Sequence, residues 1–197
     1  MPKFIIDVKT NKGLFSELDD YYKFLEDMSL DMQEIKCPQY TFLSFVLFCA
    51  ATLEYSINQC ITVKFYNLIH EDVYKDVAER FVYLPMSKKF NLIPKILSSN
   101  KFQFDNKHKV IKDMIKLVDT RNSFIHNKNY FQDLKIEKVD SEWNKFSTPS
   151  TIGKTSNKEM CFHFFDSLKK LKKGFFDPIL DGKEIQANDL LVSIISN

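Results

Sequence analysis

Long stretches of this sequence place apolar residues at every third or fourth position, the repeat expected of helices with one buried face. Glycine and proline, which most often interrupt such stretches, number only 4 and 6 among 197 residues. Strands that are buried on one face need an alternating pattern instead. We therefore predict an all-α fold with no parallel sheet.

Prolines and polar clusters divide the predicted helices. Pro38, Pro85 and Pro94 punctuate the first two thirds of the chain. Residues 127–156 hold clusters of Asn, Asp, Ser, Thr, Pro and Gly, which predict an irregular insertion or a small hairpin. The apolar run after Pro178 is too short for its period to distinguish a helix from an added strand. We predict helices over residues 14–34, 39–69, 72–82, 88–98, 107–126 and 157–173.

The length of the chain suits one domain, residues 1–197, because a single core is sustainable beyond this size. The chain has four cysteines, at Cys37, Cys49, Cys60 and Cys161. None has C-x-x-C spacing, so neither a zinc site nor a disulfide framework is indicated. We expect reduced thiols in the core, and no metal or other cofactor.

The most apolar run covers residues 42–53 and stops at Glu54, short of the roughly 20 residues that cross a bilayer. The first ten residues include Asp7 and show no secretory cleavage signal. These features predict no membrane span, no membrane partner and a cytoplasmic location.

The charges are unevenly distributed along the chain, although the net charge is only +2. Residues 1–72 carry 6 Lys and 11 acidic residues, a net charge of −5, whereas residues 86–128 carry 10 basic and 3 acidic residues, a net charge of +7. The basic block can present a positive face to a polyanion. A lysine-rich solvated surface would give the same pattern.

Polar residues interrupt the apolar face of the helix predicted at 107–126. Placing successive residues about 100° apart puts Arg121 near the middle of the apolar arc. Asn122 and His126 border the arc and are neighbours at i,i+4 spacing. Three polar groups therefore lie on or beside a face that should pack inward.

A buried guanidinium needs partners, since burying it alone costs several kcal/mol. Glu54 lies near the centre of the apolar stripe of the helix predicted at 39–69, so the two faces would pair Glu54 with Arg121. The chain uses 26 Lys and only 2 Arg, which suggests a site that needs a planar fork of five donors. Cations such as Arg121, His126 and Lys128 also suit a helix C-terminus through its dipole, and this simpler explanation stays open.

The segment Arg121-Asn-Ser-Phe-Ile-His126 resembles the signature of the HEPN superfamily of small helical-bundle proteins. That signature is an Arg followed after four to six residues by a His, often with Asn, Asp or His directly after the Arg, as Asn122 is here. The preceding helix resembles the penultimate bundle helix of the family. The resemblance covers about residues 39–126, and residues 127–197 form an extension.

The resemblance implies an antiparallel helical bundle and a metal-independent endoribonuclease. Such enzymes are usually homodimers in which Arg and His of both chains line one cleft. Many are toxins or act in abortive defence against phage, so the expected partners are RNA, a second copy and an antitoxin or defence-system protein. Other members lack activity and serve as interaction or RNA-binding modules, which is the alternative function. A nucleotide-binding regulator is a weaker third option, since no Gly-rich phosphate loop is present.

The residues fit this chemistry, because the 2′-hydroxyl of RNA supplies the nucleophile. His126 can exchange protons near neutral pH, and Arg121 can bind the phosphate as negative charge develops. Asn122 would orient either group, and Glu54 would hold Arg121 in place. Basic side chains would bind the RNA backbone; the candidates are Lys109, Lys112, Lys116 and Lys128.

Arg121 and His126 are five residues apart, so on one helix they point about 140° apart. One phosphate cannot then contact both from close range. In a two-fold dimer, Arg121 of one chain can face His126 of the other.

Overall fold

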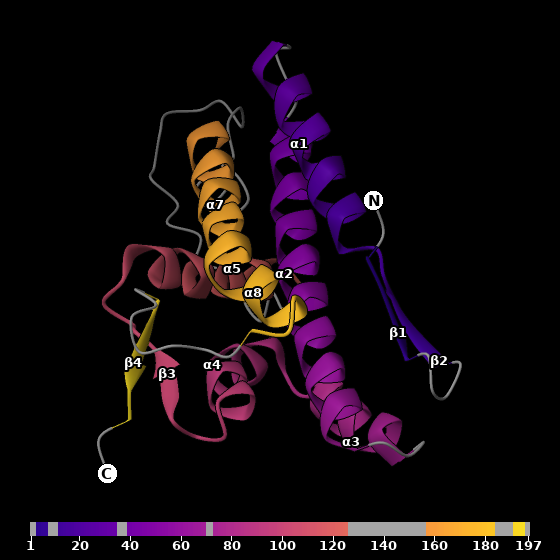
Figure 1. The fold of residues 1–197 in the computed structure, drawn as a ribbon. Coiled ribbons are helices and arrows are strands. Elements are labelled where there is room, and N and C mark those ends of the chain that lie inside the picture. Colours follow the sequence, from indigo (N-terminus) through magenta and orange to yellow (C-terminus); the bar gives the residue numbers. More distant parts are fainter. Residues whose placement is uncertain are drawn as a thin grey trace, which may run out of the picture.

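The computed structural model describes residues 3–7, 12–34, 39–69, 73–125, 157–183 and 191–195, and the chain is mostly helical, which confirms the predicted all-α class. Figure 1 shows the helices gathered into one bundle. The insertion predicted at 127–156 lies outside the described residues. The longer helices are α1 (Leu18–Glu34), α2 (Gln39–Leu68), α3 (Val73–Val82), α4 (Met86–Leu97), α5 (Lys109–Ile125) and α7 (Lys158–Leu171).

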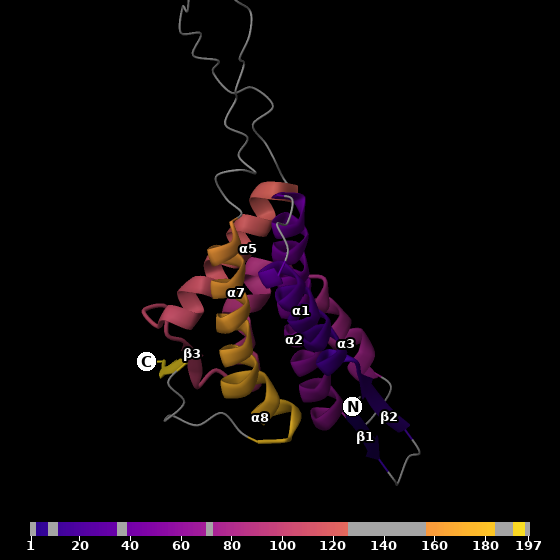
Figure 2. The ribbon, with the colours of Figure 1, turned by 90° about the horizontal axis from the view of Figure 1, so that it is seen from above.

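The 30-residue helix α2 is the centre of the bundle and packs against α1, α3, α4, α5 and α7. In Figures 1 and 2, α7 and α5 lie on one side of α2 and α1 lies on the other. A helix covered on several sides must be apolar on several sides. Its buried side chains accordingly include Phe45, Val46, Cys49, Leu53, Ile57, Cys60 and Ile61.

By length and composition, α2 could cross a membrane: within Thr41–Leu68, an 18-residue window has a mean hydropathy of 1.3. The apolar stretch is thus longer than the predicted run of residues 42–53, because apolar residues resume after Glu54. Core helices of soluble proteins can have the same length and composition. In the fold, 44% of that window is buried, and the helix forms the centre of the bundle.

In the part of the chain that the structure describes, two antiparallel strand pairs accompany the helices. β1 (Lys3–Asp7) pairs with β2 (Lys12–Ser16), and this hairpin extends away from the bundle in Figures 1 and 2. The prediction of a helix from residue 14 was therefore wrong. Gly13 disfavours helix formation, and the helix begins only where Asp19 and Asp20 can interact with its N-terminal dipole.

The second pair joins β3 (Phe102–Phe104) to β4 (Val192–Ile194) near the C-terminus. Asp105 N donates to Leu191 O at 3.0 Å, and Ile195 N donates to Lys101 O at 3.1 Å, which extends the pairing at both ends. Within the segment after Pro178 that the sequence left undecided, Val192–Ile194 therefore forms a strand.

Three cysteines, Cys49, Cys60 and Cys161, are buried free thiols, as predicted. Burial raises the pKa of Cys161 to about 12. Cys37 lies outside the described residues.

The helical segment predicted to end at residue 173 extends further along the chain. After α7, a π-helical turn, η1 (Lys172–Phe176), leads into the short helix α8 (Asp177–Leu180). A π turn brings residues five apart together, and Lys172 Nζ donates to both carboxylate oxygens of Asp177, at 2.8 and 3.0 Å. Lys172 also pairs with Asp19 of α1 at 3.0 Å. The turn therefore connects the C-terminal helices to α1.

Lys172 and the buried Tyr22 both affect how stability depends on pH. Burial alone would lower the pKa of Lys172, but its hydrogen bonds to Asp177 and Asp19 raise that pKa overall. Burial raises the pKa of the Tyr22 phenol well above its ordinary value of about 10. Both groups therefore hold their protons longer in the folded than in the unfolded chain.

We expect the protein to lose stability as the pH rises above about 9, because the unfolded chain releases the protons of the three buried thiols, and then those of Tyr22 and Lys172, before the folded chain does. Tyr22→Phe removes one of these protons, so above about pH 10 the loss of unfolding free energy should become shallower by about 1.4 kcal/mol per pH unit. Urea unfolding between neutral and alkaline pH measures this slope. Tyr83→Phe, at a side chain that is 79% exposed, is the control and should keep the wild-type slope. Equal slopes for all three proteins would contradict the prediction.

Candidate functional site

Helix α5 carries the predicted motif, and its start is fixed by local hydrogen bonds. Asp105 Oδ1 accepts from Lys107 N at 2.9 Å, and His108 Nδ1 accepts from Val110 N at 3.3 Å, so two amides near the helix start have side-chain acceptors. The predicted apolar arc is buried, through Val110, Ile111, Met114, Leu117 and Val118. This face packs against α2 and α7.

A side-chain hydrogen bond also connects α5 to α7. Ser167 Oγ, which is buried, donates to Asp113 Oδ2 at 2.6 Å. Hydrogen bonds to an ionised acceptor are the stronger kind. The motif helix is therefore held in place on the side of α7 as well as on the side of α2.

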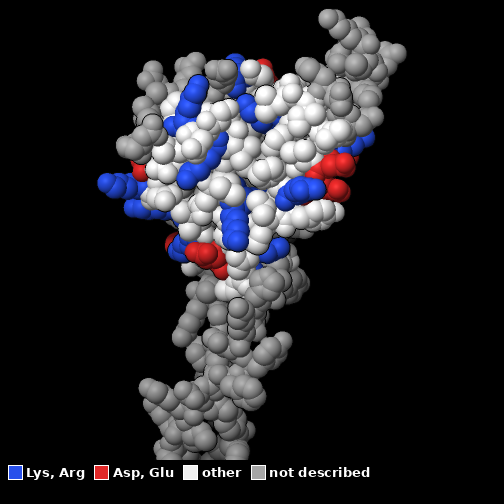
Figure 3. Space-filling model, turned by 90° about the horizontal axis from the view of Figure 1, so that it is seen from below, with Lys and Arg blue, Asp and Glu red and all other residues white. Residues whose placement is uncertain are grey.

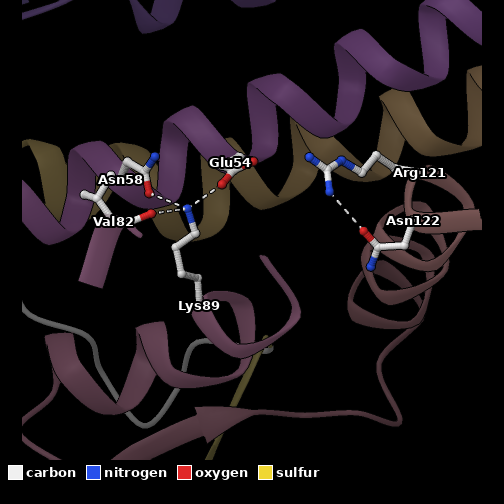
Figure 4. A network of polar contacts seen from close by, with 6 residues as sticks. All are labelled: Glu54, Asn58, Val82, Lys89, Arg121 and Asn122. Atoms are coloured by element: carbon white, nitrogen blue, oxygen red, sulfur yellow. Dashed lines mark hydrogen bonds and ion pairs between the residues drawn. The ribbon is translucent and has the colours of Figure 1, made fainter. Parts of the chain in front are cut away.

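Arg121 lies near the end of α5 and is half-buried rather than fully buried. Its Nη1 donates to Asn122 Oδ1 at 3.0 Å, so the structure brings these two predicted site residues together. Figure 4 shows the guanidinium extending from α5 toward the part of α2 that carries Glu54. Among the described residues, Asn122 supplies the one hydrogen-bond acceptor to Arg121.

Glu54 pairs with Lys89 of α4, which corrects the predicted pairing with Arg121. The Lys89 ammonium also donates to Asn58 Oδ1 at 3.1 Å and to Val82 O at 2.8 Å (Figure 4). Its three protons thus meet three acceptors. The Lys89 side chain is only 1% exposed, so its charge has a greater need for a carboxylate than the half-buried guanidinium does.

Lys89 is a residue that the sequence analysis missed. It lies on the inward face of α4, between residues that form an apolar stripe with helical spacing. The signal in the sequence was a lysine on the apolar face of a predicted helix, which is the same kind of signal that identified Arg121. The buried stripe consists of Met86, Phe90, Ile93 and Leu97.

The described charges of this site do not cancel. Glu54 contributes one negative charge, whereas Lys89 and Arg121 contribute two positive charges. Lys89 uses all three of its protons within the fold, so Arg121 is the cation with donors left for a ligand. The site is therefore suited to an anion.

Three of the predicted RNA-binding lysines, Lys109, Lys112 and Lys116, are exposed on α5. Their spacing of three and four residues puts them on one side of the helix. Basic side chains also gather elsewhere: Figure 3 shows mostly Lys and Arg among the charged groups at the end of the molecule where α3 and α4 lie.

His126 and Lys128 lie beyond Ile125, the last residue of α5, and outside the described residues. No family model, curated protein or solved structure matches this chain. The resemblance to the HEPN superfamily thus remains a prediction from the motif and its helix.

The difference in exposure between Lys89 and Glu54, 1% against 33%, predicts unequal costs of breaking their ion pair. Glu54→Ala leaves a fully buried ammonium without a carboxylate and should lower the free energy of unfolding by about 3 kcal/mol. Lys89→Met leaves a carboxylate that water can reach, and should cost about 1–2 kcal/mol. Urea unfolding measures both values.

Two further variants control this comparison. Lys88→Met changes the neighbouring exposed lysine and should alter stability by no more than about 0.5 kcal/mol. Glu54→Leu combined with Lys89→Met removes both charges and should recover much of the loss. If Lys89→Met lost more unfolding free energy than Glu54→Ala, the prediction would be contradicted. The carboxylate, and not the ammonium, would then be the group that costs more when left without its partner.

Proposed function

We propose that this protein is a metal-independent endoribonuclease whose active site contains Arg121 and His126. The observation that carries the proposal is the half-buried guanidinium of Arg121, oriented by Asn122 at the end of α5, in a site where Lys89 already neutralises Glu54. A phosphate can then bind Arg121 without competing with a carboxylate partner. The resemblance of the motif to the HEPN signature supplies the reaction.

In the proposed reaction, the 2′-oxygen of RNA attacks the adjacent phosphorus, and the bond from phosphorus to the 5′-oxygen breaks. One base takes the proton of the 2′-hydroxyl, and one acid gives a proton to the departing 5′-oxygen. The products are a 2′,3′-cyclic phosphate and a 5′-hydroxyl. His126 is the residue proposed to exchange these protons, because its pKa is ordinarily about 6.5.

Arg121 would stabilise the negative charge that develops on the phosphate oxygens. The exposed lysines of α5 would attract the RNA backbone toward the end of this helix. A homodimer is part of the proposal, because Arg121 and His126 of one chain point about 140° apart if α5 continues regularly. The family resemblance further suggests a cytoplasmic toxin or phage-defence role.

Cleavage of a mixed RNA pool in excess EDTA tests the proposal. Wild-type protein should cleave, and Arg121→Ala and His126→Ala should each reduce the rate at least about 100-fold, because each removes a transition-state interaction. Arg80→Ala is the matched control, since Arg80 is the other arginine and is exposed on α3. It should cleave like wild type.

Each variant is first compared with wild type in thermal unfolding and sedimentation, so that a lost fold or dimer is not mistaken for lost chemistry. Intact RNA with the wild-type protein, or cleavage that survives both substitutions, contradicts the nuclease. Intact RNA together with bound RNA would favour the alternative, an inactive RNA-binding or interaction module.

A further inference from the structure

Aromatic side chains form an exposed ridge where α1 meets α2. Tyr21 stacks on Tyr55 with ring centroids 4.6 Å apart, and the rings of Phe24 and Phe48 are 4.9 Å apart. Phe24 is 47% exposed and Phe48 is 40% exposed. The two phenylalanines contact each other from different helices, so their exposed area is continuous rather than scattered. Such continuous apolar area on a surface marks an interaction site.

Carboxylates lie along the same side of α1 as this ridge. Asp20 lies four residues before Phe24, and Asp27 and Asp31 lie three and seven residues after it. At about 100° per residue, all three are within about 60° of Phe24 around the helix axis. All three are exposed, and among the described residues none of them forms an ion pair. Lys23, the nearby cation of α1, points about 100° away from Phe24.

We propose that this aromatic and acidic surface binds a basic amphipathic helix of a partner protein. Apolar side chains of that helix would pack on Phe24 and Phe48, and its Lys or Arg residues would pair with the aspartates. Asp20 and Asp31 are eleven residues apart on α1, a rise of about 16 Å, which equals three turns of a bound helix. Positive groups over the exposed rings would add cation–π attraction.

The charges disfavour the other occupants. Nucleic acids and anionic lipid headgroups carry the same sign as the aspartates and would be repelled. A second copy docked through the same face would bring the aspartates of one chain against those of the other. A cationic helix has the complementary charge, and it needs no contribution from the nuclease site, so this proposal is independent of the proposed function.

A fluorescent synthetic peptide tests the surface. The probe is a helix of Leu and Lys whose lysines repeat the spacing of Asp20, Asp27 and Asp31, and the control peptide has the same composition in scrambled order. Fluorescence anisotropy should show that the scrambled peptide binds at least about tenfold more weakly. Added salt should weaken binding of the patterned peptide.

Protein variants separate the apolar and charged contributions. The double variant Phe24→Ser with Phe48→Ser, and the triple variant Asp20→Asn, Asp27→Asn, Asp31→Asn, should each weaken binding of the patterned peptide about tenfold or more. Leu68→Ser and Asp76→Asn change exposed residues elsewhere and should bind like wild type. Arg121→Ala should also bind like wild type, which separates this proposal from the nuclease. Because the substituted side chains are exposed, except for the half-buried Arg121, thermal unfolding should show that all variants fold.

Three results would overturn the proposal. The first is equal binding of the patterned and scrambled peptides, or peptide binding unchanged in both multiple variants. The second is sedimentation of the protein with phosphatidylcholine–phosphatidylglycerol vesicles, lost in Phe24→Ser with Phe48→Ser, which would assign the face to a membrane. The third is a wild-type dimer that becomes a monomer in the same double variant, which would assign the face to a second copy.

Discussion

Burial of the central helix α2 is the constraint on which the rest of this structure depends. The helices α1, α3, α4, α5 and α7 pack against it, and each must supply an apolar face that matches its side chains. A carboxylate in this helix is costly unless a cation reaches it. Lys89 of α4 supplies this cation: its ammonium pairs with Glu54 and also donates to Asn58. The Lys89 side chain is itself almost completely removed from water. The polar interruption of α2 therefore fixes how α4 approaches it.

The Lys89 contacts also determine the electrostatics beside the motif helix. If Glu54 were bound to Arg121, the guanidinium would be neutralised and a phosphate would have to displace a carboxylate. With Glu54 bound to Lys89, Arg121 keeps its charge, and Asn122 orients it without adding a charge of its own. An ion pair on one side of the site thus leaves a cation available on the other.

Periodicity predicted most of this fold because helices are local structures. The predicted range 39–69 differs from α2 by one residue, and the apolar face predicted for the helix at 107–126 is buried along most of α5. The failures concern contacts between distant segments. Residues 14–16 pair with β1 instead of extending α1, and the partner of Glu54 depends on which helix lies beside it. The prediction considered only Arg121 as the partner of Glu54, although Lys89 also lies at an inward position and is almost fully buried.

In the fold, the acidic and basic segments of the sequence form different surfaces. The acidic first third includes α1, whose exposed aspartates border an aromatic ridge, whereas the basic block includes α5, which carries exposed lysines. A polyanion is repelled by the first surface and attracted by the second, and a cationic helix has the opposite preference. Two ligands of opposite charge can therefore bind one molecule without competing for the same surface, so binding of a partner to α1 need not block access to the end of α5.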